Sequence, residues 1–409
     1  MSPVRRMAAG LAVGLAVVSW GVVAGAPPPG PAGASSAALA SGSGSGSAPA
    51  VHTVVGGGTL AAPSGLALDG AGDLFVADTG HCRVLVVPSH NGHAYGVALR
   101  RGHATTIAGG HCGGSVGHPT GVAVDLTGDV YFAEANEQRV RVIQPGTSGV
   151  TDVVGTGRAG SGGDGGPATA GQLDEPTGVA VDRSGDLFIA DTANCRVQAV
   201  PVSSGELLGQ SVVRDHVYTV AGTGVCGSAG QGGPLGGAQL FDPVAVATDF
   251  AGDLLVADVG DQAVLLAPSV SGTYYGSNIA AGNLGLVVGG TGSYGPYVAD
   301  GLPATSVGAE LNDPRGLALT PTGTLIVTDG FMHVIRFVPA QSGTDFGRAV
   351  SAGDLYTLAG ALPVSNPVAA GDGTRWVGTH MGSPAGVAVS TSGAVLYTDA
   401  ATGLVRGIG

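Results

Sequence analysis

Short apolar runs separated by glycine- or proline-containing turns alternate along the chain, and one block of this pattern recurs six times. Its clearest copies read Pro-Ser-Gly-Leu-Ala-Leu-Asp-Gly-Ala-Gly-Asp-Leu-Phe-Val-Ala-Asp from Pro63 and Pro-Thr-Gly-Val-Ala-Val-Asp-Arg-Ser-Gly-Asp-Leu-Phe-Ile-Ala-Asp from Pro176. The other copies open at Pro119, Pro243, Pro314 and Pro384. Because self-similarity at a nearly fixed period indicates a repeat architecture, we expect this block to determine the fold.

Each block predicts two strands, which we name A (as in Gly-Val-Ala-Val-Asp) and B (as in Leu-Phe-Val-Ala-Asp). Between them lie three-residue turns that end in glycine, such as Leu126-Thr127-Gly128, and these suit a tight hairpin. A third strand, C, follows, as in Arg196 to Val200, and a fourth, D, precedes the next block, as in Tyr218 to Gly222. Four short antiparallel strands repeated radially are the unit of a β-propeller.

The last blade has strands A, B and C but no D, whereas a spare D-like segment, Thr53-Val54-Val55-Gly56-Gly57, precedes the first block. The sequence therefore predicts an all-β fold, a six-bladed β-propeller of four-stranded antiparallel blades over residues 51–409. We expect the N-terminal strand to complete the last blade, since closure of the ring removes open sheet edges.

These blocks resemble NHL repeats, a six-bladed propeller family. Strand D with its following loop, as in Val220-Ala-Gly-Thr-Gly224, resembles the form found in extracellular sensor domains of bacterial receptor serine/threonine kinases and in other secreted bacterial propellers. The resemblance covers about residues 51–409. It implies the fold but leaves function open, because the family includes binding modules and a few enzymes. Thr320 and Ser390 depart from the Asp that ends strand A elsewhere.

The first 50 residues differ from the repeats. Arg5 and Arg6 precede an uncharged run of apolar and small residues from Ala8 to Ala26, which predicts an export signal or an uncleaved N-terminal anchor over residues 1–26. Residues 27–50 are rich in Pro, Gly, Ser and Ala and predict a flexible linker. We therefore expect a secreted or extracytoplasmic protein that touches a membrane only if that segment is retained.

The four cysteines support this location. Cys82 and Cys195 stand directly before strand C, and Cys112 and Cys226 follow strand D of the same blade, 30 and 31 residues later. Because strands C and D are antiparallel neighbours, this register selects the disulfides Cys82–Cys112 and Cys195–Cys226 from three possible connectivities. Disulfides fit an exported protein. The competing interpretation, a metal site, requires all four in one cluster, although the pairs lie in different blades.

Amino-acid composition limits the possible chemistry and the possible classes of partner. All 16 basic residues are Arg, so catalysis through a lysine side chain is excluded. The formal net charge is −13. An acidic body without a basic stripe excludes nucleic acid as a partner.

The D–A and B–C loops share one face, where the residues before the six prolines form a predicted ring at the channel mouth. These residues are Ala62, His118, Glu175, Asp242, Asp313 and Ser383. The three acids and the histidine suit a cation or a basic ligand, and Arg315 is expected to neutralise Asp313 or Asp242. In the competing interpretation, short polar residues favour the turn before proline and satisfy local amides.

Other polar residues recur in every blade, so we interpret them as structural. The acids that end strand B are Asp78, Glu134, Asp191, Asp258, Asp329 and Asp399, and we expect them to accept bonds from amides of the B–C loops. The Gly163–Gly166 loop is a weak candidate for calcium, because it lacks regularly spaced oxygen ligands.

The predicted function is a non-catalytic binding propeller without a cofactor, which holds a protein, peptide or cell-surface glycan on the D–A/B–C face. The alternative is a metal-dependent lyase or hydrolase that uses a divalent cation in the channel, with His118, Glu175, Asp242 and Asp313 as first candidates. His81, His111 and His118 map to this face, and three histidines with an open position form a catalytic zinc site. We expect only His118 to lie near the axis, because the other two precede cysteines.

Overall fold

The structure is a computed structural model that describes residues 51–56, 58–290, 300–360 and 381–408. The predicted export signal or anchor (residues 1–26) and the linker (residues 27–50) lie outside these residues. Within the described ranges, no helix is long and apolar enough to cross a membrane.

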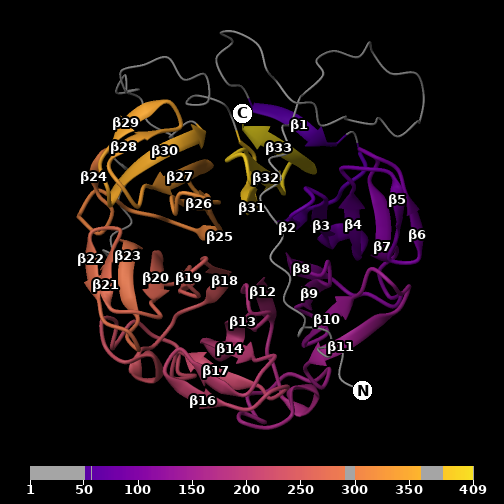
Figure 1. The fold of residues 1–409 in the computed structure, drawn as a ribbon, viewed down its shortest axis with the longest axis horizontal. Coiled ribbons are helices and arrows are strands. Elements are labelled where there is room, and N and C mark those ends of the chain that lie inside the picture. Colours follow the sequence, from indigo (N-terminus) through magenta and orange to yellow (C-terminus); the bar gives the residue numbers. More distant parts are fainter. Residues whose placement is uncertain (1–50, 57, 291–299, 361–380, 409) are drawn as a thin grey trace.

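Six antiparallel sheets surround a central axis as the blades of a propeller (Figure 1). Blade 1 contains β2 (Pro63–Leu68), β3 (Leu74–Asp78), β4 (Arg83–Val87) and β7 (Thr105–Gly109). Blade 2 contains β8 (Pro119–Val124), β9 (Val130–Glu134), β10 (Arg139–Ile143) and β11 (Val150–Val154). Blade 3 contains β12 (Pro176–Val181), β13 (Leu187–Asp191), β14 (Arg196–Val200) and β17 (Tyr218–Ala221). Blade 4 contains β18 (Pro243–Thr248), β19 (Leu254–Asp258), β20 (Ala263–Ala267) and β23 (Gly285–Gly289). Blade 5 contains β25 (Pro314–Leu319), β26 (Leu325–Asp329), β27 (Val334–Val338) and β30 (Asp354–Gly360). Blade 6 contains β31 (Pro384–Val389), β32 (Val395–Asp399), β33 (Leu404–Ile408) and β1 (Val51–Val55). The predicted strand order A, B, C, D is confirmed in every blade.

Closure by the N-terminal strand is also confirmed. Strand β33 pairs with β32 on one side and with β1 on the other, where Thr53 lies opposite Arg406. Figure 1 shows the two ends of the ring meeting at β1 and β33. Blade 6 is therefore built from both ends of the repeat region.

The core consists of apolar clusters between neighbouring blades, and the described residues form six of them. Strand B is buried along its whole length in each blade, because successive side chains point to opposite faces and both faces are covered. In β19, Leu254 and Val256 pack toward blade 3, while Leu255 and Ala257 pack toward blade 5. The uninterrupted apolar character of strand B follows from this arrangement.

Strand A lies at the axis, where the blades approach most closely. In five blades its third residue is glycine, and a Cβ atom there would lie 2.2 to 2.6 Å from a backbone oxygen of the next blade. These glycines are Gly65, Gly121, Gly178, Gly316 and Gly386. Blade 4 has Ala245 at this position, so its strand A requires more room beside blade 5.

The turns between strands A and B have the predicted form. Their glycines have φ between 83° and 94°, a left-handed conformation that glycine adopts without steric cost. In blades 5 and 6 the hydroxyls of Thr320 and Ser390 accept the bonds from Thr324 N and Ala394 N, each at 3.0 Å, that an aspartate accepts in the other blades. The departures from the repeat therefore keep the same turn.

The sequence analysis missed a hairpin in four of the C–D loops. In blade 1 its strands are β5 (Gly92–Ala94) and β6 (Val97–Leu99), and in blade 3 they are β15 (Gly205–Leu207) and β16 (Gln210–Val212). In blade 4 they are β21 (Gly272–Tyr274) and β22 (Ser277–Ile279), and in blade 5 they are β28 (Gly343–Asp345) and β29 (Arg348–Val350). Tyr95 (φ 52°) and Gly96 (φ 73°) form the first turn, and positive φ at both positions is typical of a type I′ hairpin. The Tyr95 hydroxyl donates to Gly128 O at 2.8 Å, so this hairpin contacts blade 2.

The long D–A loops do not remain at the channel mouth. In the loop before blade 3, Pro167 forms a bridge with His216, and β24 (Leu302–Pro303) pairs with β30 in the same way. These loops therefore cover the outer edge of the next blade, which protects an exposed strand. Within the loop considered for calcium, Asp164 Oδ1 accepts from Thr219 N at 2.6 Å and from Thr219 Oγ1 at 2.9 Å.

Both expected disulfides are confirmed. Cys82 pairs with Cys112 and Cys195 pairs with Cys226, with Cα atoms 5.0 and 5.1 Å apart. Four short 3₁₀ helices complete the described elements: η1 (Thr79–His81), η2 (Ala168–Ala170), η3 (Thr192–Asn194) and η4 (Leu235–Gly237).

Candidate functional site

A cavity with a volume of about 520 Å³ lies on the axis, lined by strand A of all six blades. Cavities of this size suit small molecules or single side chains of a larger partner. Strand A runs inward from the mouth, so its fourth residue lies deeper than the residues before the proline. This deeper level is a ring of buried aliphatic side chains: Leu66, Val122, Val179, Val246, Leu317 and Val387.

Four of the five candidate site residues line this cavity: Glu175, Asp242, Asp313 and Arg315. Arg315 Nε donates to Asp313 Oδ2 at 2.6 Å, so its partner is Asp313 and not Asp242. Among the residues that the structure describes, no side chain pairs with the carboxylates of Glu175 and Asp242, both of which are exposed. The rim therefore carries uncompensated negative charge above an aliphatic wall.

The acids that end strand B hold the rim in place. In every blade, this carboxylate accepts a bond from the amide of the residue two positions before the proline, as Asp258 accepts from Phe241 N at 2.9 Å. The structural role is as expected. The expected donors are confirmed in blades 4 to 6, where the B–C loop amides of Asp261, Met332 and Thr402 donate to these acids, but the donor common to all six blades lies at the end of the D–A loop.

Arginine compensates these buried acids in blades 1 to 3, where the pairs are Arg83 with Asp78, Arg139 with Glu134, and Arg196 with Asp191. Blade 4 has Ala263 at that position, so Asp258 has no arginine partner. Burial raises the pKa of Asp258 to about 8, and the neighbouring charges of Asp261 and Asp242 add to this rise. A fully buried acid without a cationic partner among the described side chains thus lies directly beneath the rim of blade 4.

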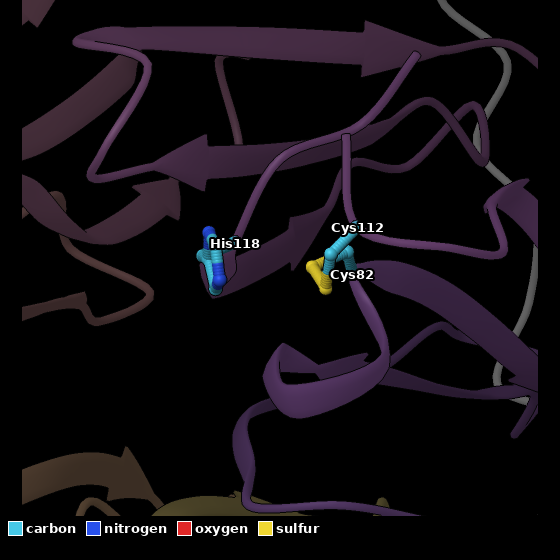
Figure 2. Close-up of side chains that lie close together, drawn as sticks. All are labelled: Cys82, Cys112 and His118. Carbon is cyan, nitrogen blue, oxygen red and sulfur yellow. A yellow bond between two sulfur atoms is a disulfide. The ribbon is translucent and has the colours of Figure 1, made fainter. Parts of the chain in front are cut away.

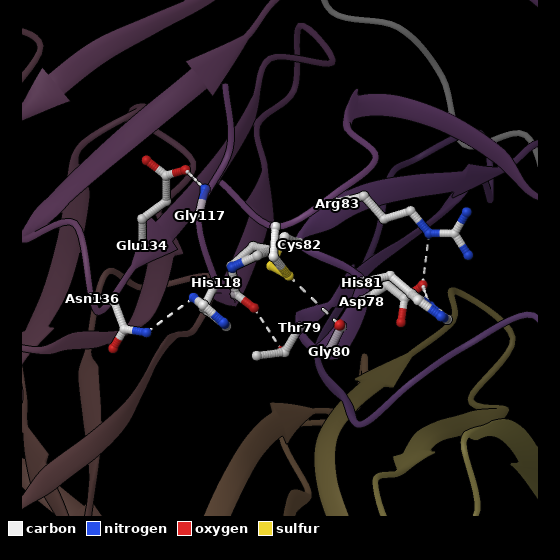
Figure 3. The surroundings of a disulfide bond; sticks show 12 residues. Asp78, Thr79, Gly80, His81, Cys82, Arg83, Gly117, His118, Glu134 and Asn136 are labelled. Carbon is white, nitrogen blue, oxygen red and sulfur yellow. Dashed lines mark hydrogen bonds and ion pairs between the residues drawn. A yellow bond between two sulfur atoms is a disulfide. The ribbon is translucent and has the colours of Figure 1, made fainter. Parts of the chain in front are cut away.

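His118, the fifth candidate, is not part of the cavity lining. Its imidazole nitrogen lies within 4.8 Å of the sulfurs of Cys82 and Cys112 (Figure 2). Asn136 Nδ2 is 2.9 Å from His118 Nδ1 (Figure 3), and the His118 amide donates to Glu137 Oε2 at 3.3 Å. His118 therefore stands apart from the acids that line the cavity, and its imidazole lies beside the disulfide of blade 1.

The three histidines considered for zinc do not converge. His81 Nδ1 is 2.9 Å from the buried Asp78 Oδ2, and His111 is exposed at the start of the D–A loop that ends with His118. In the described part of the chain, the group of three potential ligands that lie close together is Cys82, Cys112 and His118, whose two sulfurs are bonded to each other. Zinc binds thiolate sulfur, so this arrangement does not supply three ligands.

The sequence analysis missed a set of hydroxyls that bridge neighbouring blades beside the cavity. Thr177 Oγ1 donates to Val244 O at 2.8 Å, and Thr192 Oγ1 donates to Pro243 O at 2.7 Å. In the described ranges such bridges cross five of the six junctions, from Ser64, Thr79, Thr120, Thr177, Thr192, Thr328 and Thr398. Among the described residues there is none between blades 4 and 5, because Val244 and Val259 replace the threonine pair and Ala257 stands where blades 5 and 6 have Thr328 and Thr398. Alignment of these three repeat positions would have revealed the difference.

Comparison with known proteins supports the repeat. A family model of the NHL repeat matches residues 60–87 and 173–199, in blades 1 and 3. The chain is 34% identical over 89 residues to Protein SUPPRESSOR OF QUENCHING 1, chloroplastic, of Arabidopsis thaliana, a match that covers 22% of this chain and 8% of the relative. It is 29% identical over 178 residues to NHL repeat-containing protein 2 of Bos taurus, which covers 41% of this chain and 24% of that protein. The matches thus span less than a quarter of each relative.

A solved propeller has a similar fold. It is an auxiliary nutrient binding protein from Bacteroides thetaiotaomicron, with a TM-score of 0.54, 11% identity, and coverage of 86% of this chain and 69% of that chain. At this identity the likeness shows the fold alone. The repeat pattern, the matches of the family model in blades 1 and 3 and the closed ring of six blades support the NHL-repeat β-propeller family.

Proposed function

We propose that this protein is an exported binding module that holds a protein, peptide or cell-surface glycan at the mouth of its central channel, without catalysis. The observation that carries this proposal is the cavity of about 520 Å³, with Glu175, Asp242 and Asp313 at its rim. Unlike the acids that end strand B, these three do not recur in all six blades. Polar residues that the repeat does not require are the first candidates for binding.

The surrounding face suits a macromolecular partner. Phe241 and Phe331 lie in loops of this face and are 43% and 66% exposed. Exposed aromatic side chains beside charged groups are typical of binding surfaces. The similar propeller from Bacteroides thetaiotaomicron is named as a nutrient binding protein, so this architecture supports binding there.

The proposed export rests on residues 1–26 and on the two disulfides, which persist in oxidising compartments. It is tested by expressing the full chain, and a variant that lacks residues 2–26, in a bacterial host with an export pathway. We expect the full chain outside the cytoplasm with both disulfides formed, and the truncated variant inside. Equal distribution of the two chains would contradict export.

Binding is tested by probing a peptide array and a bacterial cell-surface glycan array with the labelled full chain. We expect discrete binding that Asp242→Asn weakens. Glu206→Gln is the matched control, because Glu206 is an exposed acid in the hairpin of blade 3, away from the mouth. Loss of binding in both variants, or in neither, would contradict a site at the channel mouth.

A further inference from the structure

The junction between blades 4 and 5 differs from the other five junctions at the channel wall. Val244 and Val259 stand where blade 3 has Thr177 and Thr192, and Ala245 stands where five blades have glycine. Val244 and Ala245 are half-buried and pack on the apolar cluster between blades 4 and 5. The core therefore reaches the channel surface here and leaves an apolar strip without hydroxyl groups.

Acidic side chains flank this strip at the rim. Asp242 precedes strand A of blade 4 and Asp313 precedes strand A of blade 5, and both line the same cavity as Val244, Ala245 and Val259. Asp313 is paired with Arg315, whereas the carboxylates of Asp242 and the neighbouring Glu175 have no partner among the described side chains. The site thus offers an aliphatic contact and an excess of negative charge side by side.

Few groups match both features. Lysine and arginine side chains have an aliphatic stem and a cationic head, so the stem packs on apolar surface while the head meets carboxylates. A bare metal ion fits poorly, because the oxygens of Glu175, Asp242 and Asp313 do not all lie within 4.8 Å of one another. A glycan requires hydrogen-bonding groups along the wall, and Val244 and Val259 offer no hydroxyl where blade 3 has Thr177 and Thr192.

We propose that the junction of blades 4 and 5 is a subsite for an arginine or lysine side chain of a peptide partner. The stem lies on Val244, Ala245 and Val259, and the cation is held by Asp242 with Glu175. This proposal rests on the proposed binding function, and it narrows the partner class to a basic peptide.

The test uses acetylated, amidated tripeptides Gly-Xaa-Gly, in which Xaa is arginine, lysine, citrulline or norleucine, titrated into the full-length protein and followed by nuclear magnetic resonance. Citrulline keeps the arginine shape without its charge. We expect the arginine and lysine peptides to bind about tenfold more tightly than the citrulline peptide. Asp242→Asn should remove that preference without changing the citrulline affinity.

The stem contact is tested with Val244→Thr/Val259→Thr, which installs the threonine pair of blade 3. It should weaken the arginine and norleucine peptides alike, by about threefold to tenfold. Val270→Thr is the control and should leave affinity unchanged, because Val270 is 68% exposed in the C–D loop of blade 4, away from the channel mouth. Melting curves check that each variant is folded, and Asp242→Asn tests the charge contact independently.

Two results would overturn the subsite. One is equal binding of the arginine and citrulline peptides, and the other is an unchanged affinity in both Asp242→Asn and the valine-to-threonine variant. If the arrays find a ligand at the mouth that the arginine peptide does not displace, the subsite is wrong while the proposed function stands. If the arrays find no ligand sensitive to Asp242→Asn, the proposed function itself fails.

Discussion

Blades 3 and 4 share the same strand order but differ at five equivalent positions. Blade 3 has the Arg196–Asp191 ion pair, the Cys195–Cys226 disulfide, the Thr177 and Thr192 bridges, and Gly178. Blade 4 has instead an acid without a cation, a glutamine, two valines and an alanine: Asp258, Gln262, Val244, Val259 and Ala245. Residues that give up stabilising contacts without local compensation concentrate at functional sites. The comparison thus supports a binding role for blade 4.

The largest expected effect concerns Asp258. Its folded-state pKa of about 8 exceeds the ordinary value of 3.8, so the folded protein keeps a proton that the unfolded chain loses between those pH values. Stability therefore falls as pH rises from about 4 to about 8, by on the order of 5 kcal/mol, and then stays level. Asp258→Asn should remove this pH-dependent part of the stability, so the variant should be more stable than the unsubstituted protein at pH 9. Thermal melts from pH 5 to pH 9 measure it, and parallel profiles of the two proteins would contradict it.

The ion pair of blade 3 provides the opposite test. Arg196 Nε donates to Asp191 Oδ2 at 2.8 Å, and both side chains are buried. Arg196→Ala leaves Asp191 buried without its cation, and this substitution should cost about 3–5 kcal/mol of unfolding free energy. Chemical denaturation measures the loss. The control, Arg183→Ala, removes an exposed arginine from the same blade and should cost less than about 1 kcal/mol. Equal stability of the two variants would refute the contribution of the pair.

The disulfide of blade 3 closes a segment of 31 residues that blade 4 leaves open. Cys195→Ser/Cys226→Ser should destabilise the protein by about 3 kcal/mol, because the crosslink restricts the unfolded chain. Cys82→Ser/Cys112→Ser is the matched variant in blade 1 and should have a similar effect, since its separation is 30 residues. Melting temperatures of both variants measure the change. Unchanged values would show that the disulfides are dispensable for stability.

The smallest expected effect concerns the hydroxyl bridges. Thr177→Val/Thr192→Val removes two donors to the backbone oxygens of Val244 and Pro243, which should cost about 1–3 kcal/mol. The reciprocal change, Val244→Thr/Val259→Thr, is expected to be neutral or slightly stabilising. Melting temperatures of the two variants are compared directly. A larger loss from the reciprocal change would mean that the valines stabilise blade 4.

Much of the site could not be foreseen from the repeat. The positions of Glu175, Asp242 and Asp313 at one mouth were predicted, because the residue before each proline occupies the same place in its blade. The direction of the His118 ring was not predicted, because it depends on Asn136, which lies 18 residues away in the sequence. The outer hairpins were missed because their strands of three residues are too short to show a periodic pattern.

The sequence by itself determined the six blades, the closure by the N-terminal strand and the pairing of Cys82–Cys112 and Cys195–Cys226. These features depend on register within a repeat, which spacing along the chain records directly. The tertiary structure alone decided which partner neutralises Arg315 and which junction lacks hydroxyl bridges. It also decided that Asp258, unlike the acids that end strand B in blades 1 to 3, has no arginine partner among the described residues. Those properties depend on contacts between neighbouring blades, where side-chain direction and burial determine which polar groups meet and which are left without a partner.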